Sequence, residues 1–217
     1  MQRKITRTFT GEITSISGLT PVMTMYKEET DSGGFRCWLQ EEEQQQLVEY
    51  YDDYERELAI KLMLQSGLRA DEVPRVTADC IQDSDAEFMV LKVPKAKRGY
   101  RETFIPSDLA TEILSIYKVK DGVNIDDPII DKTERTIQNW VYDAAEDLAE
   151  KTANEDWLNL SAHDCRRTWA TKMIQSGVTG DVVMDWGGWS DYQTFRDHYW
   201  RRDDEQIQSN LEDAGLA

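Results

Sequence analysis

The sequence is short of cysteine, of long apolar runs and of positive charge, and each shortage excludes a class of protein. Its 217 residues include only three cysteines, Cys37, Cys80 and Cys165, and none of them forms a C-x-x-C pair. An odd number of widely spaced cysteines supports neither a disulfide framework nor a zinc ribbon, so we expect buried free thiols. No run of about 18 apolar residues is present, which excludes a membrane-spanning helix. No apolar segment follows Met1 to Lys4, so we expect no signal peptide and a cytoplasmic protein.

Positive charge is the third shortage. The chain has 25 lysines and arginines against 42 acidic residues, a formal net charge of −17. This balance by itself argues against a nucleic-acid partner, because such partners normally require a basic surface. An acid excess also keeps halophilic proteins soluble, and at molar salt counterion release contributes little to DNA affinity. We therefore hypothesise a halophilic source, in which the acidity is compatible with a DNA partner.

The pattern along the chain predicts an α+β protein, mainly helical with one small antiparallel sheet. Residues 1–37 show little periodicity and predict an arm or linker. Apolar residues at helical spacing predict one helix over residues 41–65. Further helices are expected from Ser107, over 133–153, 163–176, 181–186 and 192–199. The runs 88–93 and 103–105 predict two strands, joined by the basic segment 95–101 with Gly99 in the turn.

One short motif carries most of the functional information. His163 and Arg166 are three residues apart, so on a helix they share a face, and Tyr199 follows 33 residues after Arg166. Imidazole, guanidinium and phenol together can attack a phosphodiester without a metal. Upstream, Glu72 is placed to orient Arg69 while the guanidinium keeps donors for a phosphate. The plain alternatives are a surface ion pair and a histidine in the first turn of a helix.

Two other segments fit the same chemistry. Four cations, Lys95, Lys97, Arg98 and Arg101, lie within seven residues of an otherwise acidic chain. A lysine on a β-turn can reach into a groove and donate a proton to a leaving oxygen, although a solvated turn is the alternative. Trp189 offers one N–H donor and a large apolar face.

In this order the motifs resemble those of the tyrosine recombinases, also called phage-type integrases. The stretch Leu64 to Glu72 resembles the first arginine box of that family, and Ser161 to Thr171 resembles the second. Gly177 to Ser190 has the family's spacing, with Trp189 where most members have histidine. The resemblance covers about residues 38–200. It implies the tyrosine recombinase catalytic-domain architecture over residues 38–202, followed by an acidic tail, 203–217, with an apolar stripe of Ile207 and Leu211.

The resemblance implies a site-specific recombinase or integrase that cuts and rejoins double-stranded DNA through a 3′-phosphotyrosyl intermediate, without metal or cofactor. In that reaction Tyr199 is the nucleophile, Arg69 and Arg166 hold the non-bridging oxygens, His163 assists proton movement, and Lys97 protonates the leaving oxygen. The implied catalytic set is Arg69, Lys97, His163, Arg166, Trp189 and Tyr199. Further DNA contacts are expected from Lys95, Arg98, Arg101 and Arg167. The resemblance also implies a synaptic tetramer on DNA, with the tail docking on a neighbouring subunit, and a haloarchaeal host, virus or mobile element as source.

The sequence departs from the family pattern in three places. Tyr199 stands ten residues after Trp189, where members usually place the tyrosine at nine, and Tyr192 is the other candidate. The hairpin lysine is either Lys97 or Lys95, and Arg98 stands at the strict count. Thirty-seven N-terminal residues are too few for the usual core-binding domain. The displaced tyrosine and the missing domain keep open the alternative of an inactive or accessory DNA-binding regulator. A type IB topoisomerase-like strand transferase is a second alternative, because it uses the same residue types.

Overall fold

A computed structural model describes residues 25–94, 100–119 and 122–199, together with residues 208, 211–212 and 215–216 of the tail. Within them the elements are, in order, β1 (Tyr26–Glu29), β2 (Phe35–Trp38), α1 (Glu41–Val48), α2 (Tyr54–Ser66), η1 (Val73–Arg75), η2 (Ala78–Cys80), β3 (Ile81–Asp83), β4 (Met89–Pro94), β5 (Tyr100–Ile105), α3 (Ser107–Val119), α4 (Glu134–Thr152), η3 (Glu155–Asn159), α5 (Ala162–Gln175), α6 (Gly180–Gly187) and α7 (Tyr192–His198). The predicted α+β class, mainly helical, is confirmed, with two small antiparallel sheets rather than one. No helix in the described part of the chain is long and apolar enough to cross a membrane.

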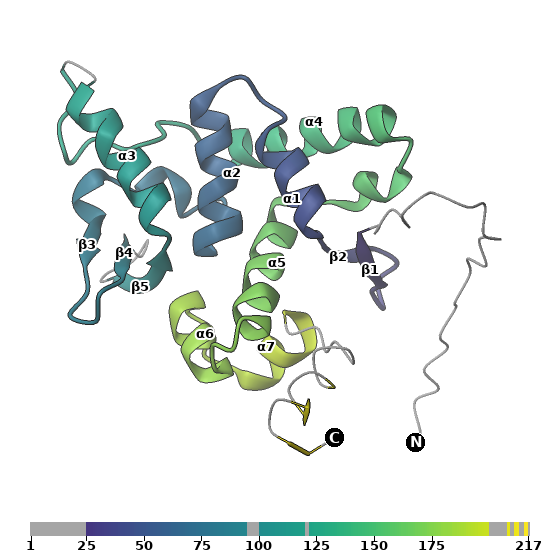
Figure 1. Cartoon of the computed structure of the whole chain (residues 1–217). Helices are drawn as coiled ribbons and strands as arrows, with labels where there is room; N and C mark the ends of the chain where they lie inside the picture. The colour runs from purple at the N-terminus through teal and green to yellow at the C-terminus, as the bar shows by residue number, and fades with distance from the viewer. Residues whose placement is uncertain are drawn as a thin grey trace.

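Helix α5 is the central element of the molecule. It contacts α2, α4, α6 and β2, and it runs from the layer of α1, α2 and α4 down to α6 and α7 (Figure 1). Its Cys165, Trp169 and Ala170 are almost fully buried. The start of α5 therefore lies near α1, α2 and α4, and its end lies near α6 and α7. The second box, Ser161 to Thr171, covers the first part of this helix.

The apolar interior has two parts. The larger core lies among α2, α3, α4 and the three-stranded sheet, with Leu58, Leu62 and Ile105 fully enclosed. A smaller cluster around Trp169 joins α5 to α6 and α7, and it includes Phe195 and Tyr199. The proposed nucleophile is thus a member of a packed cluster rather than part of a loose tail.

The single helix predicted over residues 41–65 is wrong, because the structure divides it. Helix α1 ends at Val48 and α2 begins at Tyr54. Asp53 forms the new start: its carboxylate accepts a hydrogen bond from the backbone N–H of Arg56 at 3.1 Å. A side-chain oxygen that satisfies a free N–H of the first turn stabilises a helix start there, which overrides the continuous apolar periodicity.

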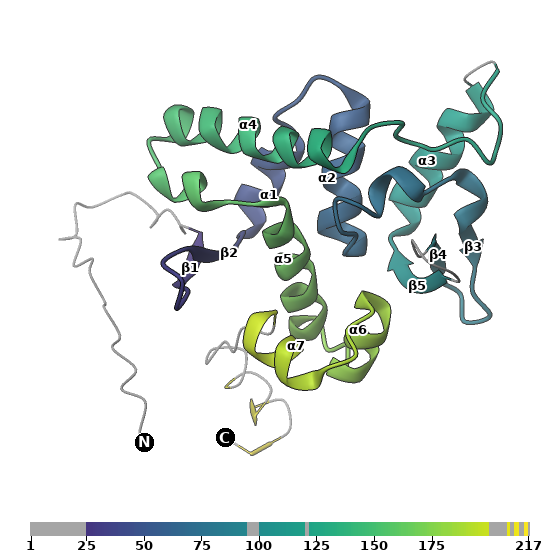
Figure 2. The ribbon, with the colours of Figure 1, turned by 180° about the vertical axis from the view of Figure 1, so that it is seen from behind.

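Part of the region expected as an arm or linker forms regular structure. Strands β1 and β2 pair antiparallel, with Tyr26 opposite Trp38, and the hairpin lies beside the start of α5 when the molecule is seen from behind (Figure 2). The backbone N–H of Cys37 donates to the carboxylate of Asp164 at 3.0 Å. This fully buried aspartate therefore fixes the hairpin to α5.

The second sheet has the order β3-β4-β5, in which β3 was not predicted. Strands β4 and β5 form the predicted hairpin, from Met89 opposite Ile105 to Pro94 opposite Tyr100. Along β5, Arg101, Thr103 and Ile105 alternate inward. The turn of the hairpin, residues 95–99, lies outside the described residues, and with it the expected roles of its two lysines and its arginine.

Candidate active site

The site begins where α2 ends, at Gly67. This residue has φ +65° and terminates the helix in the left-handed conformation that glycine adopts without strain. A side chain here is excluded for a second reason, since a Cβ atom would overlap the indole ring of Trp169. The Gly67 carbonyl accepts hydrogen bonds from Arg166 and, at 3.4 Å, from Nη2 of Arg101. The end of α2 thus positions two guanidinium groups through one carbonyl.

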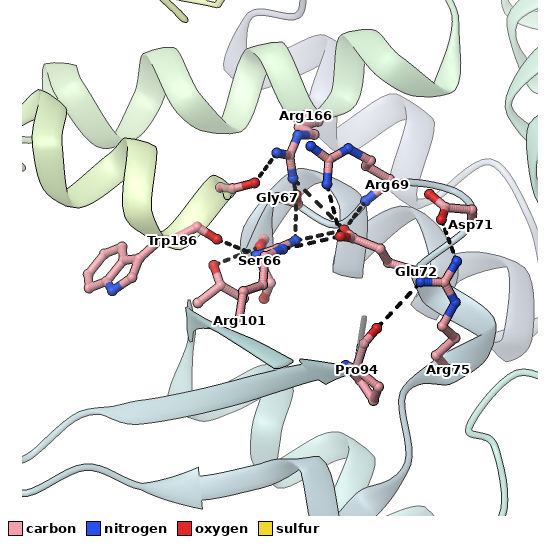
Figure 3. Close-up of polar contacts among 12 residues, drawn as sticks. Ser66, Gly67, Arg69, Asp71, Glu72, Arg75, Pro94, Arg101, Arg166 and Trp186 are labelled. Atoms are coloured by element: carbon pink, nitrogen blue, oxygen red, sulfur yellow. Dashed lines mark hydrogen bonds and ion pairs between the residues drawn. The ribbon is translucent and has the colours of Figure 1, made fainter. Parts of the chain in front are cut away.

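Glu72 is the common partner of the arginines (Figure 3). Its Oε1 accepts from Nη1 of Arg69 at 3.0 Å and from Nε of Arg101 at 3.2 Å. Its Oε2 accepts from Nη2 of Arg101 at 2.7 Å and from the Arg69 backbone N–H at 2.8 Å. Burial acts to raise the pKa of Glu72, but the hydrogen bonds and charge of Arg101, together with its other partners, lower this pKa to about 2. The predicted orientation of Arg69 by Glu72 is confirmed.

Arg166 is fully buried. Its guanidinium donates to the carbonyls of Gly67 and Gly187, and its Cζ lies 4.1 Å from the centre of the Trp189 ring. Burial first, and then the nearby positive charges, lower the pKa of Arg166 from its ordinary value. Nε of Arg166 has no hydrogen-bond partner among the residues that the structure describes. The guanidinium is thus held at the site but turned toward backbone carbonyls.

His163 and Tyr199 meet across the start of α5 and the end of α7. The Nε2 atom of His163 lies 2.5 Å from the hydroxyl oxygen of Tyr199, and the two rings meet edge to face. Burial, followed by the charges of Arg167 and Arg166, lowers the pKa of His163 to about 4. The imidazole is therefore neutral near pH 7 and able to accept the phenolic proton. Tyr192, at the start of α7, is 52% exposed.

The backbone at the end of α7 is held by α5. Nε of Arg167 donates to the carbonyl of His198 at 3.2 Å, and Oγ1 of Thr171 donates to the carbonyl of Tyr199 at 2.9 Å. Arg167 itself forms an ion pair with the buried carboxylate of Asp164. These bonds satisfy carbonyls that a helix end leaves without an intrahelical partner. They fix the position of the Tyr199 backbone relative to His163.

Trp189 closes the site on the apolar side. Its ring centre lies 4.4 Å from that of Tyr199 and 5.0 Å from that of Phe195. Its Nε1 is buried and has no hydrogen-bond partner in the described part of the chain. The indole N–H is therefore a donor that no described residue uses.

Of the four expected DNA contacts, only Arg101 and Arg167 lie among the described residues. Lys95, Lys97 and Arg98 lie outside the described residues. Arg101 does not lie on the surface, because its position on the inward face of β5 buries it to 7% exposure. Arg167 is occupied by Asp164 and the His198 carbonyl. The inward role of Arg101 was missed, although its alternation with Thr103 and Ile105 was a signal for it.

The structure brings the five described residues of the predicted catalytic set close together. Arg69, His163, Arg166, Trp189 and Tyr199 surround one region between α2, α5, α6 and α7. The three cysteines are free and buried, as predicted. Among the described residues no group of three or more His, Cys, Asp or Glu side chains has the arrangement of a metal site.

Comparisons with known proteins concern the family and the fold of the chain. The sequence model of the phage integrase family matches residues 37–206. The XerA recombinase structure has a TM-score of 0.63 at 16% identity, and the alignment covers 82% of this chain and 64% of that chain. The Tn1549 transposon integrase in complex with transposon right end DNA has a TM-score of 0.59 at 13% identity, covering 82% and 66%. The XerH recombinase bound to difH substrate has a TM-score of 0.54 at 16% identity, covering 81% and 53%.

The extent of these matches limits what they carry. At these identities the similarity is one of fold. The chain spans about two thirds or less of the length of each of these three proteins. No curated protein sequence matches this chain.

Proposed function

The chain belongs to the phage integrase family, and on that premise we propose that it is a site-specific recombinase that cuts and rejoins double-stranded DNA through a 3′-phosphotyrosyl intermediate. The observation that carries the proposal is the 2.5 Å approach of His163 Nε2 to the Tyr199 hydroxyl, beside Arg69 and Arg166. A phenol, a neutral imidazole and guanidinium groups are the parts that a metal-free attack on a phosphodiester needs.

In the proposed reaction the Tyr199 oxygen attacks the scissile phosphorus as the bond to the 5′ oxygen breaks. The phenolic proton passes to His163, and a lysine of the hairpin turn, Lys97 or Lys95, protonates the 5′ oxygen. The new phosphotyrosyl ester retains the energy of the broken phosphodiester, so the reverse attack by a 5′-hydroxyl reseals DNA without ATP. Each hydrogen bond that strengthens as charge builds on the phosphate lowers the barrier.

The two arginines enter this reaction from different states. The Arg69 side chain is 36% exposed and uses Nη1 for Glu72, which leaves its other guanidinium donors for the phosphate in the proposed reaction. Arg166 is enclosed and donates to two carbonyls, and its Nε–H, which has no partner among the described residues, is buried as well. We therefore expect Arg166 to exchange at least one of these carbonyl bonds for a phosphate oxygen when it meets DNA. We propose that DNA binding drives this exchange, with the catalytic domain assembled as a synaptic tetramer on two duplexes.

The test is the formation of a covalent protein–DNA adduct. A pool of randomised nicked suicide duplexes is incubated with the protein in molar KCl, and denaturant-resistant complexes are separated and sequenced. The wild-type protein is expected to form an adduct, Tyr199→Phe is expected to form none, and Tyr192→Phe serves as the matched control that retains it. An adduct that persists in Tyr199→Phe and vanishes in Tyr192→Phe would overturn the assignment of the nucleophile.

The same materials separate the two alternative functions. A wild-type protein that binds duplexes from the pool but forms no adduct acts as an accessory DNA-binding protein. A protein that relaxes any supercoiled plasmid without paired sites acts as a type IB topoisomerase. Strand exchange only between duplexes that carry the selected sequence supports the recombinase.

A further inference from the structure

Arg101 is the most extensively bonded cation of the site, although it stands on the strand that follows the basic turn. Its side chain is 5% exposed. Its guanidinium donates twice to Glu72, at 3.2 and 2.7 Å, and also to the carbonyls of Gly67 and Trp186 (Figure 3). All three of its nitrogens are therefore bonded inside the protein, and these bonds use four of the five N–H donors of the guanidinium.

These bonds join three segments that are distant in the sequence. The Gly67 carbonyl ends α2, the Trp186 carbonyl lies in the last turn of α6, and Arg101 itself belongs to β5. The fit is close, because a Cβ atom on Gly188 would lie 3.0 Å from Cδ of Arg101. Arg101 thus holds the hairpin strand against the two turns that also present Arg69 and Trp189.

Arg101 adds one positive charge to the cluster of arginines around Glu72. Glu72 is 6% exposed and contacts three guanidinium groups: those of Arg69 and Arg101 at hydrogen-bond distance, and that of Arg166 with 3.9 Å between Nη1 and Oε2. In a buried environment a carboxylate attracts every nearby cation strongly. With Arg101, the Glu72 carboxylate and the three guanidinium groups together carry two net positive charges. Without Arg101, Glu72 would be paired with Arg69 and Arg166 alone, and these three groups would carry one net positive charge.

We propose that Arg101 is a positioning residue that acts through Glu72: it offsets the carboxylate so that Arg69 and Arg166 keep their positive charge for the scissile phosphate. The inference rests on the proposed function, since it assumes that these two arginines meet a phosphate. It assigns Arg101 to the chemistry of the site rather than to the DNA-contacting surface.

The first test compares two substitutions at this position. Arg101→Met removes the charge, and the rate of adduct formation at saturating DNA is expected to fall about 100-fold, the size of effect seen when one oxyanion donor is lost. Arg101→Lys keeps a charge beside Glu72 and is expected to stay within about tenfold of the wild-type rate. A lysine variant that falls as far as the methionine variant, while remaining folded by circular dichroism, would overturn the charge-offset role.

A second variant remains informative if Arg101→Met does not fold. Adding Glu72→Gln to Arg101→Met removes both opposite charges, so the net charge of Arg69 and Arg166 is no longer reduced. The double variant is expected to react at least about tenfold faster than Arg101→Met. If Arg101→Met does not fold, the double variant is compared with the wild type and is expected to react within about tenfold of the wild-type rate. A double variant slower than either single substitution contradicts the proposal.

A neutral substrate supplies a readout that a purely structural role would not move. In a methylphosphonate at the scissile position a methyl group replaces one non-bridging oxygen and removes its negative charge, so positive charge in the site matters less. The ratio of wild-type to Arg101→Met rates is expected to shrink from about 100 to below about 10 on this substrate. An unchanged ratio would mean that Arg101 only supports the fold.

Arg75 offers the matched control. It is an arginine in the same region whose side chain is 29% exposed, paired with Asp71 and bonded to the Pro94 carbonyl at 3.4 Å (Figure 3). Its backbone N–H donates to the Glu72 carbonyl at 3.0 Å, but among the described residues its guanidinium forms no ion pair with the Glu72 carboxylate. Arg75→Met is expected to keep the wild-type rate and the wild-type methylphosphonate response. The wild-type adduct is measured in parallel, so that absence of any adduct counts against the proposed function, whereas a full-rate Arg101→Met counts against this inference alone.

Discussion

The Nε2 atom of His163 lies 2.5 Å from the hydroxyl oxygen of Tyr199. The two residues are 36 positions apart, and α5 and α7 bring them together within one chain. The ten-residue interval between Trp189 and Tyr199 does not prevent this approach, and the rings of Trp189 and Tyr199 pack at a tilt of 48° with their centres 4.4 Å apart. The proposed nucleophile is therefore oriented by side chains of its own subunit.

The pKa of His163 predicts how stability depends on pH. Because the folded pKa is about 4 and the ordinary value is 6.5, the unfolded chain binds the proton more readily between these pH values. The stability that the neutral His163 contributes is thus fully present above pH 6.5. It is lost as the pH falls toward 4, and the total loss is about 3 kcal/mol. In His163→Gln the free energy of unfolding, measured by urea titration in constant KCl, is expected to vary less between pH 6.5 and 4.

His198 is the matched control, since the chain has only two histidines. Its pKa is also lowered, chiefly by burial, so His198→Gln changes the slope in the same direction. The change is expected to be smaller because this residue is less enclosed. The low pKa of Glu72, about 2, adds a separate loss of stability only below pH 4.5. If the free energy of unfolding depends on pH equally in the wild type and in His163→Gln, the low pKa of His163 is contradicted.

Thr171→Val is expected to slow adduct formation by misplacing Tyr199. The substitution removes the hydroxyl that donates to the Tyr199 carbonyl at 2.9 Å and leaves that carbonyl unsatisfied, at about 1–3 kcal/mol. A misplaced nucleophile lowers the rate at saturating DNA by about tenfold or more, while DNA affinity stays unchanged. Single-turnover kinetics and a filter-binding titration measure the two quantities.

Thr168→Val controls for the loss of a buried hydroxyl on the same helix. Thr168 Oγ1 accepts from the Leu39 backbone N–H at 3.0 Å and has no bond to α7, and the residue is 3% exposed against 6% for Thr171. Both variants are expected to lose similar stability, but only Thr171→Val loses rate. A comparable loss of rate in Thr168→Val would show that general destabilisation is the cause.

Gly67→Ala is expected to be among the most destabilising single substitutions in the protein. The new methyl group meets both the +65° φ angle and the Trp169 ring, so strain and overpacking add to about 3 kcal/mol or more. Gly177→Ala is the control, because Gly177 has φ +89° but open space around its Cβ position. It should lose only about 1–2 kcal/mol. Equal losses in urea unfolding would show that the contact with Trp169 does not matter.

The net charge of −17 predicts that KCl stabilises the fold. Salt screens the repulsion among 42 acidic residues, so the urea midpoint is expected to rise steadily up to molar KCl. Sucrose at equal osmolality stabilises by exclusion without screening, and it is expected to raise the midpoint less. Maximal stability in dilute buffer would contradict the halophilic hypothesis.

Local signals in the sequence were sufficient for several elements. Thr133 caps α4 by accepting from the Thr136 N–H, and Ser161 and Asp164 form a capping box at the start of α5. Such caps act within one turn of a helix, so residue type and spacing predict them. The break between α1 and α2 depends on Asp53 in the same way, but the continuous apolar pattern concealed it.

By itself, the sequence determined the helical face shared by His163 and Arg166 and the pairing of Glu72 with Arg69. Residues three positions apart in a helix or a tight turn are neighbours whatever the rest of the fold is. Only the tertiary structure decided that Arg101 points inward to Glu72 and that Tyr199 meets His163. These contacts join residues 29 and 36 positions apart. Their geometry depends on how α2, β5, α5 and α7 pack, which short-range spacing does not specify.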